Sequence, residues 1–266
     1  ILNTQAGMSY SHVSKLRMVM QELFRQARRS RLIIYDPAEG LLLPESVKRS
    51  HRPITKAERR HILAVAQTHP AGLWVLTILY TGLRPGETAA LFWEDIDFDR
   101  NEIHVYKAVE SGTRTIKAPK TPAGIRDIPM RQELRERLLA VRGEGAAPVF
   151  PSANGGIRSA NSLRRLWNSF AHALDLHMGA KVRDGQILQH AIAPDLTPYC
   201  LRHTFCTDLQ RAGVPINVAK ELMGHANISV TANIYTHRDQ KVLHNNMAKL
   251  NPKGRRAVGK TQEKTV

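Results

Sequence analysis

The sequence has few cysteines, no long apolar run and a shortage of acidic residues, and each feature excludes a class of protein. Two cysteines in 266 residues cannot form a disulfide framework. The longest apolar stretch, residues 72–80, is about half the length that a transmembrane helix needs, so it predicts a buried core helix and no membrane span. Residues 1–8 lack a basic segment followed by an apolar one, so we expect no secretory signal.

Apolar residues are nevertheless present in the proportion of a globular protein. Hydrophobic residues make up 42% of the chain and charged residues 23%, which excludes a disordered or fibrous protein. The 39 Lys and Arg residues outnumber the 23 Asp and Glu residues, which gives a net charge of +16 and an isoelectric point near 10.3. A positive field of this size attracts polyanions. Nucleic acid is therefore the first partner that the sequence indicates.

The chain is predicted to divide into a short N-terminal part and one larger domain. Residues 10–30 carry apolar side chains at helical spacing, but a single amphipathic helix cannot bury its own apolar face. Proline and arginine in residues 36–53 are typical of a linker. We expect three parts: the end of a truncated N-terminal helical domain plus linker at 1–53, the main domain at 54–250, and a basic disordered tail at 251–266.

The main domain is predicted to be mainly α with a small antiparallel β-sheet. Thr55 and Glu58 form the capping-box pattern that begins a helix. Alternation of β-branched residues predicts strands within 96–105, 113–117 and 125–129, with a hairpin tip at 120–124. From residue 131 to about residue 249 the spacing is helical, apart from a glycine-rich loop at 143–157 and a loose stretch at 179–195.

Five short motifs carry most of the information about function. In chain order they are YTGLRPGE at 80–87, KAPKT at 117–121, TPYCLRHTF at 197–205, LMGHA at 222–226 and SVTANIYTH at 229–237. Together they resemble the motifs of tyrosine recombinases, also called phage integrases, and are most like those of integrases from conjugative transposons and phages of Gram-positive bacteria. The resemblance covers roughly residues 10–250. It implies the catalytic-domain fold of that family over 54–250 and the end of a core-binding domain before it.

The resemblance implies a catalytic chemistry that these residue types can perform without a metal ion or ATP. Tyr235 matches the nucleophile, which attacks phosphorus and forms a 3′-phosphotyrosyl link. Arg84 and Arg202 match the two family arginines, whose guanidinium forks bind phosphate oxygens as negative charge develops. The alternative for each arginine is a surface ion pair, with Glu87 for example, or a general contact to DNA.

Three further residues match supporting roles in the family. Lys120 matches the lysine that protonates the leaving 5′-oxygen, although Lys117 lies three residues earlier and Lys120 could instead be an ordinary phosphate contact. His225 matches a histidine that hydrogen-bonds the scissile phosphate, with a buried structural histidine as the alternative. Glu87 matches an acidic residue that orients the first arginine.

One position departs from the family pattern. The family has His-x-x-Arg, whereas this chain has Tyr199 three residues before Arg202. A tyrosine can donate a hydrogen bond to phosphate but carries no positive charge at pH 7, which puts a general-base role at this position in doubt. His203 points about 100° away from Arg202 around a helix and is interpreted as structural. Cys200 and Cys206 lie about 240° apart on a continuous helix, so we expect no zinc site.

The function implied is that of a site-specific DNA recombinase that integrates or excises a mobile element. Its partners would be double-stranded DNA attachment sites, a homotetramer on DNA assembled from monomers, and an accessory directionality factor, with residues 240–250 passed to a neighbouring subunit. The expected location is the bacterial cytoplasm, at the nucleoid. Two alternatives remain: a DNA-binding module with the same fold but impaired catalysis, and a type IB topoisomerase-like enzyme that relaxes supercoils. The candidate DNA contacts, with residues 161–165 as the best groove candidate, are Arg52, Arg126, Arg131, Arg164 and Arg165.

Overall fold

The computed structural model describes residues 5, 7–44, 51–110 and 113–235, apart from the side chains of Asn233 and Tyr235. The chain divides into two compact units, Ile1–His51 and Arg52–Val266. None of the helices within the described ranges is both long enough and apolar enough to cross a bilayer. The division into a truncated N-terminal domain, a main domain and a tail stays a prediction, and the tail at 251–266 lies outside the described residues.

The first unit contains one long helix, α1 (Tyr10–Arg29), as its apolar spacing predicts. Ser9 caps its N-terminus by accepting a hydrogen bond from the backbone N–H of His12 at 3.3 Å. Val13 is buried, but Leu23 is 65% exposed. The helix therefore leaves much of its apolar face uncovered within its own unit.

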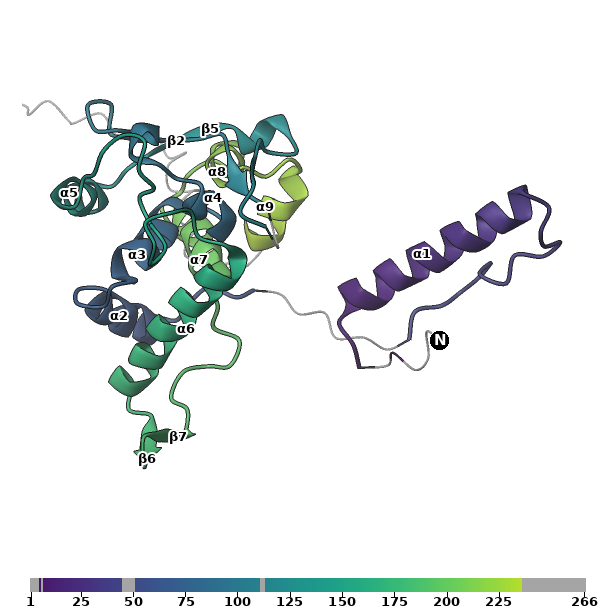
Figure 1. Cartoon of the computed structure of the whole chain (residues 1–266), viewed down its shortest axis with the longest axis horizontal. Coiled ribbons are helices and arrows are strands. Elements are labelled where there is room, and N and C mark those ends of the chain that lie inside the picture. Colours follow the sequence, from purple (N-terminus) through teal and green to yellow (C-terminus); the bar gives the residue numbers. More distant parts are fainter. Residues whose placement is uncertain (1–4, 6, 45–50, 111–112, 236–266) are drawn as a thin grey trace, which may run out of the picture. The chain divides into compact units, whose positions relative to one another are not determined.

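The second unit begins with three helices: α2 (Lys56–Val65), α3 (Gly72–Thr81) and α4 (Pro85–Ala89). The capping box predicted at α2 is present, since Thr55 and Glu58 each accept a hydrogen bond from the other's backbone N–H. Helix α3 is buried over nearly its whole length and packs along α7 (Pro198–Arg211), as Figure 1 shows. These two helices form the centre of the unit, and α7 carries Arg202 within it.

The main sheet has three antiparallel strands in the order β1-β2-β5: β1 (Ile96–Asp97), β2 (Glu102–Val105) and β5 (Arg126–Pro129). Ile103 faces Ile128 across the β2–β5 pair, and both are buried. Their burial fixes the register, because a shift by one residue would turn both side chains to the opposite face. The same register places Arg126 opposite Val105 and directs it to the protein interior.

The predicted hairpin tip at 120–124 is wrong. Strand β4 (Ile116–Lys117) pairs with β3 (Ala108–Val109) rather than with β5, and Pro122–Gly124 forms a 3-10 turn between β4 and β5, which do not pair with each other. Pro122 has no N–H to donate to a ladder. Gly124 lies so close to Pro119 that a Cβ atom on it would be 2.3 Å from the proline Cβ. The loop thus folds back on itself and carries Lys120 on a compact turn.

The remaining elements are mostly helical: α5 (Gln132–Ala140), α6 (Ala160–His177), α7, α8 (Ile216–Met223) and α9 (Ile228–Tyr235). A second hairpin, β6 (Lys181–Arg183) and β7 (Gln186–Gln189), occupies the stretch predicted to be irregular. The missed signal was Asp184-Gly185, whose φ angles of +52° and +76° suit a two-residue hairpin turn. The mainly α fold with a small antiparallel sheet is confirmed.

Candidate active site

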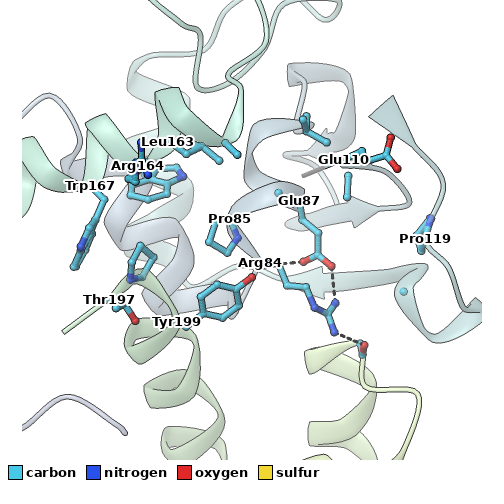
Figure 2. Close-up of a pocket in the computed structure, with 18 of the residues that line it drawn as sticks. Arg84, Pro85, Glu87, Glu110, Pro119, Leu163, Arg164, Trp167, Thr197 and Tyr199 are labelled. Carbon is cyan, nitrogen blue, oxygen red and sulfur yellow. Dashed lines mark hydrogen bonds and ion pairs between the residues drawn. The ribbon is translucent and has the colours of Figure 1, made fainter. Parts of the chain in front are cut away.

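A cavity of about 840 Å³ opens between α4, β3, the 119–124 loop, α6 and the start of α7. Figure 2 shows the side chains that surround it. One wall is apolar and includes Leu163 and Trp167 from α6. Other parts of the lining are polar and combine residues from four of the five sequence motifs: Arg84, Glu87, Lys120, Tyr199 and Gly224.

Arg84 is held at two points beside this cavity. It lies immediately before α4, where Pro85 occupies the first helical position, and its backbone N–H donates to Glu87 Oε2 at 2.8 Å. Its Nη1 donates to Glu87 Oε1 at 2.7 Å and its Nη2 donates to the carbonyl of Gly224 at 2.8 Å; Figure 2 draws both bonds, and the backbone bond to Glu87, as dashed lines. The side chain keeps 35% exposure, so its fork is oriented and still accessible from the cavity.

Arg202 lies deeper than Arg84. It is 5% exposed in the second turn of α7, and its guanidinium donates to the carbonyl of Gly82 and, at 2.5 Å, to the carbonyl of Met223. Gly82 ends α3 with φ +67°, and a Cβ on it would lie 2.5 Å from the ring of Phe205. Burial, followed by repulsion from Arg84, lowers the pKa of the Arg202 guanidinium below its ordinary value.

The prediction made for Arg126 needs a correction. The sequence predicts it as a DNA contact, but its side chain is 2% exposed and donates to Glu87 Oε1 at 3.2 Å and Oε2 at 2.9 Å. A guanidinium enclosed in this way is not on a surface that DNA can reach. The sign of a charge and its place in a strand do not reveal which face the strand buries.

Glu87 is a buried carboxylate between two guanidinium groups. Burial alone would raise its pKa, but hydrogen bonds and charge from Arg126, with further charge from Arg84 and Arg202, outweigh burial and lower the pKa to about 2. Glu87 is therefore an anion at every physiological pH. Its contact with Arg84 has the geometry that the resemblance implies for an orienting residue.

His225 follows Gly224, which ends α8 in the left-handed conformation with φ +62°. The imidazole is 9% exposed, and its Nδ1 lies 2.9 Å from the hydroxyl of Thr231 on α9. Burial, together with the positive charges of three arginines, lowers the pKa of His225 to about 4, so the ring is neutral at pH 7. Thr231 was not singled out in the sequence, although it stands one helical turn before Tyr235.

The two lysines of the second motif have different surroundings. The Nζ of Lys117 lies 2.8 Å from Glu110 Oε2, so its charge is paired at the surface. Lys120 is exposed and lines the cavity that Arg84 also lines. The geometry therefore favours Lys120 over Lys117 as the lysine that can approach a phosphate there.

The structure describes the side chain of Tyr199 but not that of Tyr235. Tyr199, the second residue of α7, is 44% exposed and lines the cavity, and Figure 2 shows its ring beside Pro85 with the hydroxyl on the side where Arg84 lies. Tyr235 is the last residue of α9, and its side chain lies outside the described residues. Helix α9 packs against both α7 and α8, the helices that position Arg202 and His225.

The remaining candidate DNA contacts also differ in their surroundings. Arg52 is tied to Glu58 at 2.7 Å and to Asp195 at 2.9 Å, which joins the start of α2 to the loop before α7. Arg131 is exposed beside the ring of Tyr80. On α6, Arg164 and Arg165 are both exposed, and Arg164 also lines the cavity. Helix α7 is continuous from Pro198 to Arg211, which is the condition for the argument against zinc at Cys200 and Cys206.

Comparisons with known proteins point in one direction. A model of the phage integrase family matches residues 52–241. A protein named tyrosine recombinase XerC-like, from Caldanaerobacter subterraneus subsp. tengcongensis, is 28% identical over 93% of this chain and 67% of its own length. The transposase from transposon Tn916 of Enterococcus faecalis is 30% identical over 61% of this chain, which spans 41% of that transposase.

A solved structure is similar as well. The Tn1549 transposon integrase, in complex with circular intermediate DNA, superposes with a TM-score of 0.73 and 25% identity. The match covers 91% of this chain and 80% of the integrase chain. The fold similarity thus extends over nearly all of the chain.

Proposed function

We propose that this chain, which belongs to the phage integrase family, cleaves and rejoins DNA at specific sites through a covalent 3′-phosphotyrosyl intermediate. The observation that carries the proposal is the joining of Arg84 and Arg202 to adjacent carbonyl groups, Gly224 O and Met223 O, immediately before His225. Arg84 lines the cavity with its guanidinium partly exposed, and Arg202 and His225 lie buried behind it, so Arg84 is the oriented fork that suits a phosphate whose negative charge increases during reaction.

The first step is attack by the Tyr235 hydroxyl oxygen on the scissile phosphorus. The P–O5′ bond breaks, the 3′-phosphate becomes esterified to Tyr235, and Lys120 donates a proton to the departing 5′-oxygen. Because a phosphodiester replaces a phosphodiester, the bond energy is kept and no ATP is consumed. Attack by a 5′-hydroxyl of another strand on the tyrosyl ester then reverses the chemistry and joins new ends.

His225 and Tyr199 have supporting roles in this step. An imidazole that is neutral at pH 7 can accept the phenolic proton or donate one hydrogen bond to a phosphate oxygen. Tyr199 lines the cavity and supplies a neutral O–H donor where the family pattern has histidine. The positive charge that faces the phosphate therefore comes from the arginines and Lys120, and not from the residue at position 199.

The relatives support mobile-element DNA as the substrate. One is named a transposase of transposon Tn916, and another is an integrase of transposon Tn1549 bound to circular intermediate DNA. We infer that this chain acts on double-stranded attachment sites at the nucleoid to integrate or excise such an element. Exchange of four strands calls for a homotetramer on two duplexes, and residues 240–250, outside the described part, are the segment we propose to pass between subunits. We also propose an accessory directionality factor as a partner of this chain.

The experiment is a covalent trap. The chain is incubated with a pool of nicked duplexes whose central region is randomised, so that the freed 5′ fragment diffuses away and the tyrosyl adduct accumulates. Protein-linked DNA is recovered and sequenced, which yields the preferred site. We expect a protease-sensitive adduct with the wild-type chain and none with Tyr235→Phe. Binding of the pool without any adduct would contradict the proposal.

A further inference from the structure

Arg126 is the most enclosed charged group beside the site, and the proposed chemistry does not use it. Its side chain makes four hydrogen bonds to three different parts of the unit. Two go to Glu87, one from Nη1 goes to the carbonyl of Gly124 at 3.2 Å, and one from Nε goes to the carbonyl of Leu222 at 2.9 Å. These partners lie on α4, on the loop that carries Lys120 and on the last turn of α8.

The contact with Glu87 links Arg126 to Arg84. The same carboxylate receives a bidentate fork from Arg126 and one bond from Arg84 Nη1. A bidentate pair fixes the plane of a carboxylate more strictly than a single bond does. The orientation of Glu87, and with it that of the Arg84 fork, therefore depends on Arg126.

The end of α8 links Arg126 to Arg202 and His225. Three consecutive carbonyl groups accept from three different arginines: Leu222 from Arg126, Met223 from Arg202 and Gly224 from Arg84. Carbonyl groups at a helix C-terminus lack intrahelical partners and carry partial negative charge, so cations suit them. The turn that precedes His225 is thus clamped by three guanidinium groups at once.

Gly224 shows how little space remains around this clamp. A Cβ atom on Gly224 would lie 2.7 Å from Nη1 of Arg126 and 3.1 Å from the carbonyl of Ala123. Any side chain there would push against the guanidinium. The backbone before His225 and the side chain of Arg126 are packed against each other as one unit.

From these contacts we propose that Arg126 is a positioning residue for strand cleavage, holding Arg84 through Glu87 and His225 through the last turn of α8. The inference rests on the proposed function, since it concerns the same reaction. Arg126 itself does not contact DNA in this proposal, because only 2% of its side chain is exposed. Loss of the fork should therefore lower the cleavage rate and leave DNA affinity unchanged.

The test uses the full chain and the duplex recovered by the covalent trap. Two variants are compared, Arg126→Met and Arg126→Lys, the second of which keeps the charge but not the fork. Single-turnover adduct formation is measured at saturating protein, and the dissociation constant is measured in a Tyr235→Phe background. The matched control is Arg135→Lys, which removes a guanidinium that donates to the carbonyl of Phe98 at 3.1 and 3.2 Å.

We expect Arg126→Met to cleave about 10- to 100-fold more slowly, the range typical of residues that orient a reacting group through another. Arg126→Lys should recover part of that loss, while Arg135→Lys should cleave at the wild-type rate. All dissociation constants should agree within about twofold, because only a residue that touches a phosphate would weaken binding when it is replaced. Wild-type rates in both Arg126 variants, or a parallel loss of affinity, would overturn the proposal.

A second variant covers the case in which both Arg126 variants are unfolded by circular dichroism. Gly224→Ala keeps Arg126 but displaces its guanidinium by adding a Cβ atom beside it. This variant should cleave more slowly than the wild type and bind DNA with unchanged affinity. A folded Gly224→Ala protein with the wild-type rate would overturn the proposal, and unfolding of all three variants would make Arg126 a folding residue only. If the wild-type chain itself forms no adduct, the proposed function fails and the role of Arg126 fails with it.

Discussion

At the scale of single residues, the site holds more positive charge than the protein itself neutralises. Arg84 and Arg126 bind one buried carboxylate, Glu87, and these two arginines and Arg202 each bind a carbonyl group at the end of α8. Such a cluster is oriented before any substrate arrives, so little reorganisation is needed when a phosphate enters. A dianionic phosphate would supply the negative charge that the cluster lacks.

The roles of Lys120 and Lys117 can be distinguished by changing the leaving group of the substrate. Lys120→Ala should slow cleavage of a normal phosphodiester about 10²- to 10⁴-fold, because the 5′-oxygen leaves without a proton. A substrate with sulfur at the 5′-bridging position should restore the rate, since a thiolate leaves without a general acid. Single-turnover adduct formation on both substrates measures the effect.

Lys117→Ala is the matched control, because Lys117 is paired with Glu110 at 2.8 Å. It should leave both rates near those of the wild type. If the sulfur substrate did not rescue Lys120→Ala, Lys120 would be a phosphate contact and not the acid.

The sequence indicated some of these residues and misplaced others for a physical reason. Arg84 and Lys120 were identified from motifs, and the structure places them beside the same cavity. Arg126 and Arg52 were counted as surface charges because a basic residue is usually solvated. Arg126 pairs with Glu87, 39 residues away, and Arg52 pairs with Asp195, 143 residues away, in addition to the nearby Glu58; local sequence does not encode the two distant pairings.

At the scale of elements, Glu87 joins α4 to β5 through Arg126, and this link should be sensitive to acid. The pKa of Glu87 is lowered from 4.5 to about 2, so between those pH values the unfolded chain binds more protons than the folded one. Stability from this group is present above about pH 4.5 and is lost as the pH falls toward 2. The loss should be about 3 kcal/mol, at 1.36 kcal/mol per pKa unit.

Urea unfolding of Glu87→Gln at several pH values measures this contribution. The variant should show a flatter dependence of unfolding free energy on pH between about 4.5 and 2 than the wild type. Glu136→Gln, which removes an exposed carboxylate on α5, should keep the wild-type slope. An unchanged slope in Glu87→Gln would mean that the carboxylate is not held as an anion by Arg126.

Elements with a local signal were predicted, and those that depend on distant partners were not. The capping box at Thr55 and the uniformly apolar α3 are local features. The pairing of β2 with β5 joins segments about twenty residues apart, so the strands were found but their partners were assigned wrongly. The β6–β7 hairpin lacks a clear apolar alternation, because most of its residues are exposed.

At the scale of the whole molecule, a net charge of +16 predicts DNA binding that weakens steeply with salt. On duplex DNA each phosphate contact adds about 0.9 to the slope of log K against log salt. Replacing Arg164 and Arg165, both exposed on α6, by alanine should lower that slope by up to about 2. Arg52→Gln should leave it unchanged, because Glu58 and Asp195 already pair with that guanidinium.

Fluorescence anisotropy across a salt series measures these slopes. An unchanged slope in the α6 variant would move the DNA surface away from that helix. A reduced slope for Arg52→Gln would show that its ion pairs open when DNA binds.

The central claim is that one phenolic oxygen becomes esterified to DNA. Trapped adduct can be trimmed with nuclease, digested with trypsin and sequenced by mass spectrometry to find the residue that carries the nucleotide. The account predicts the nucleotide on Tyr235. A nucleotide on Tyr199, or on any residue other than Tyr235, would contradict it.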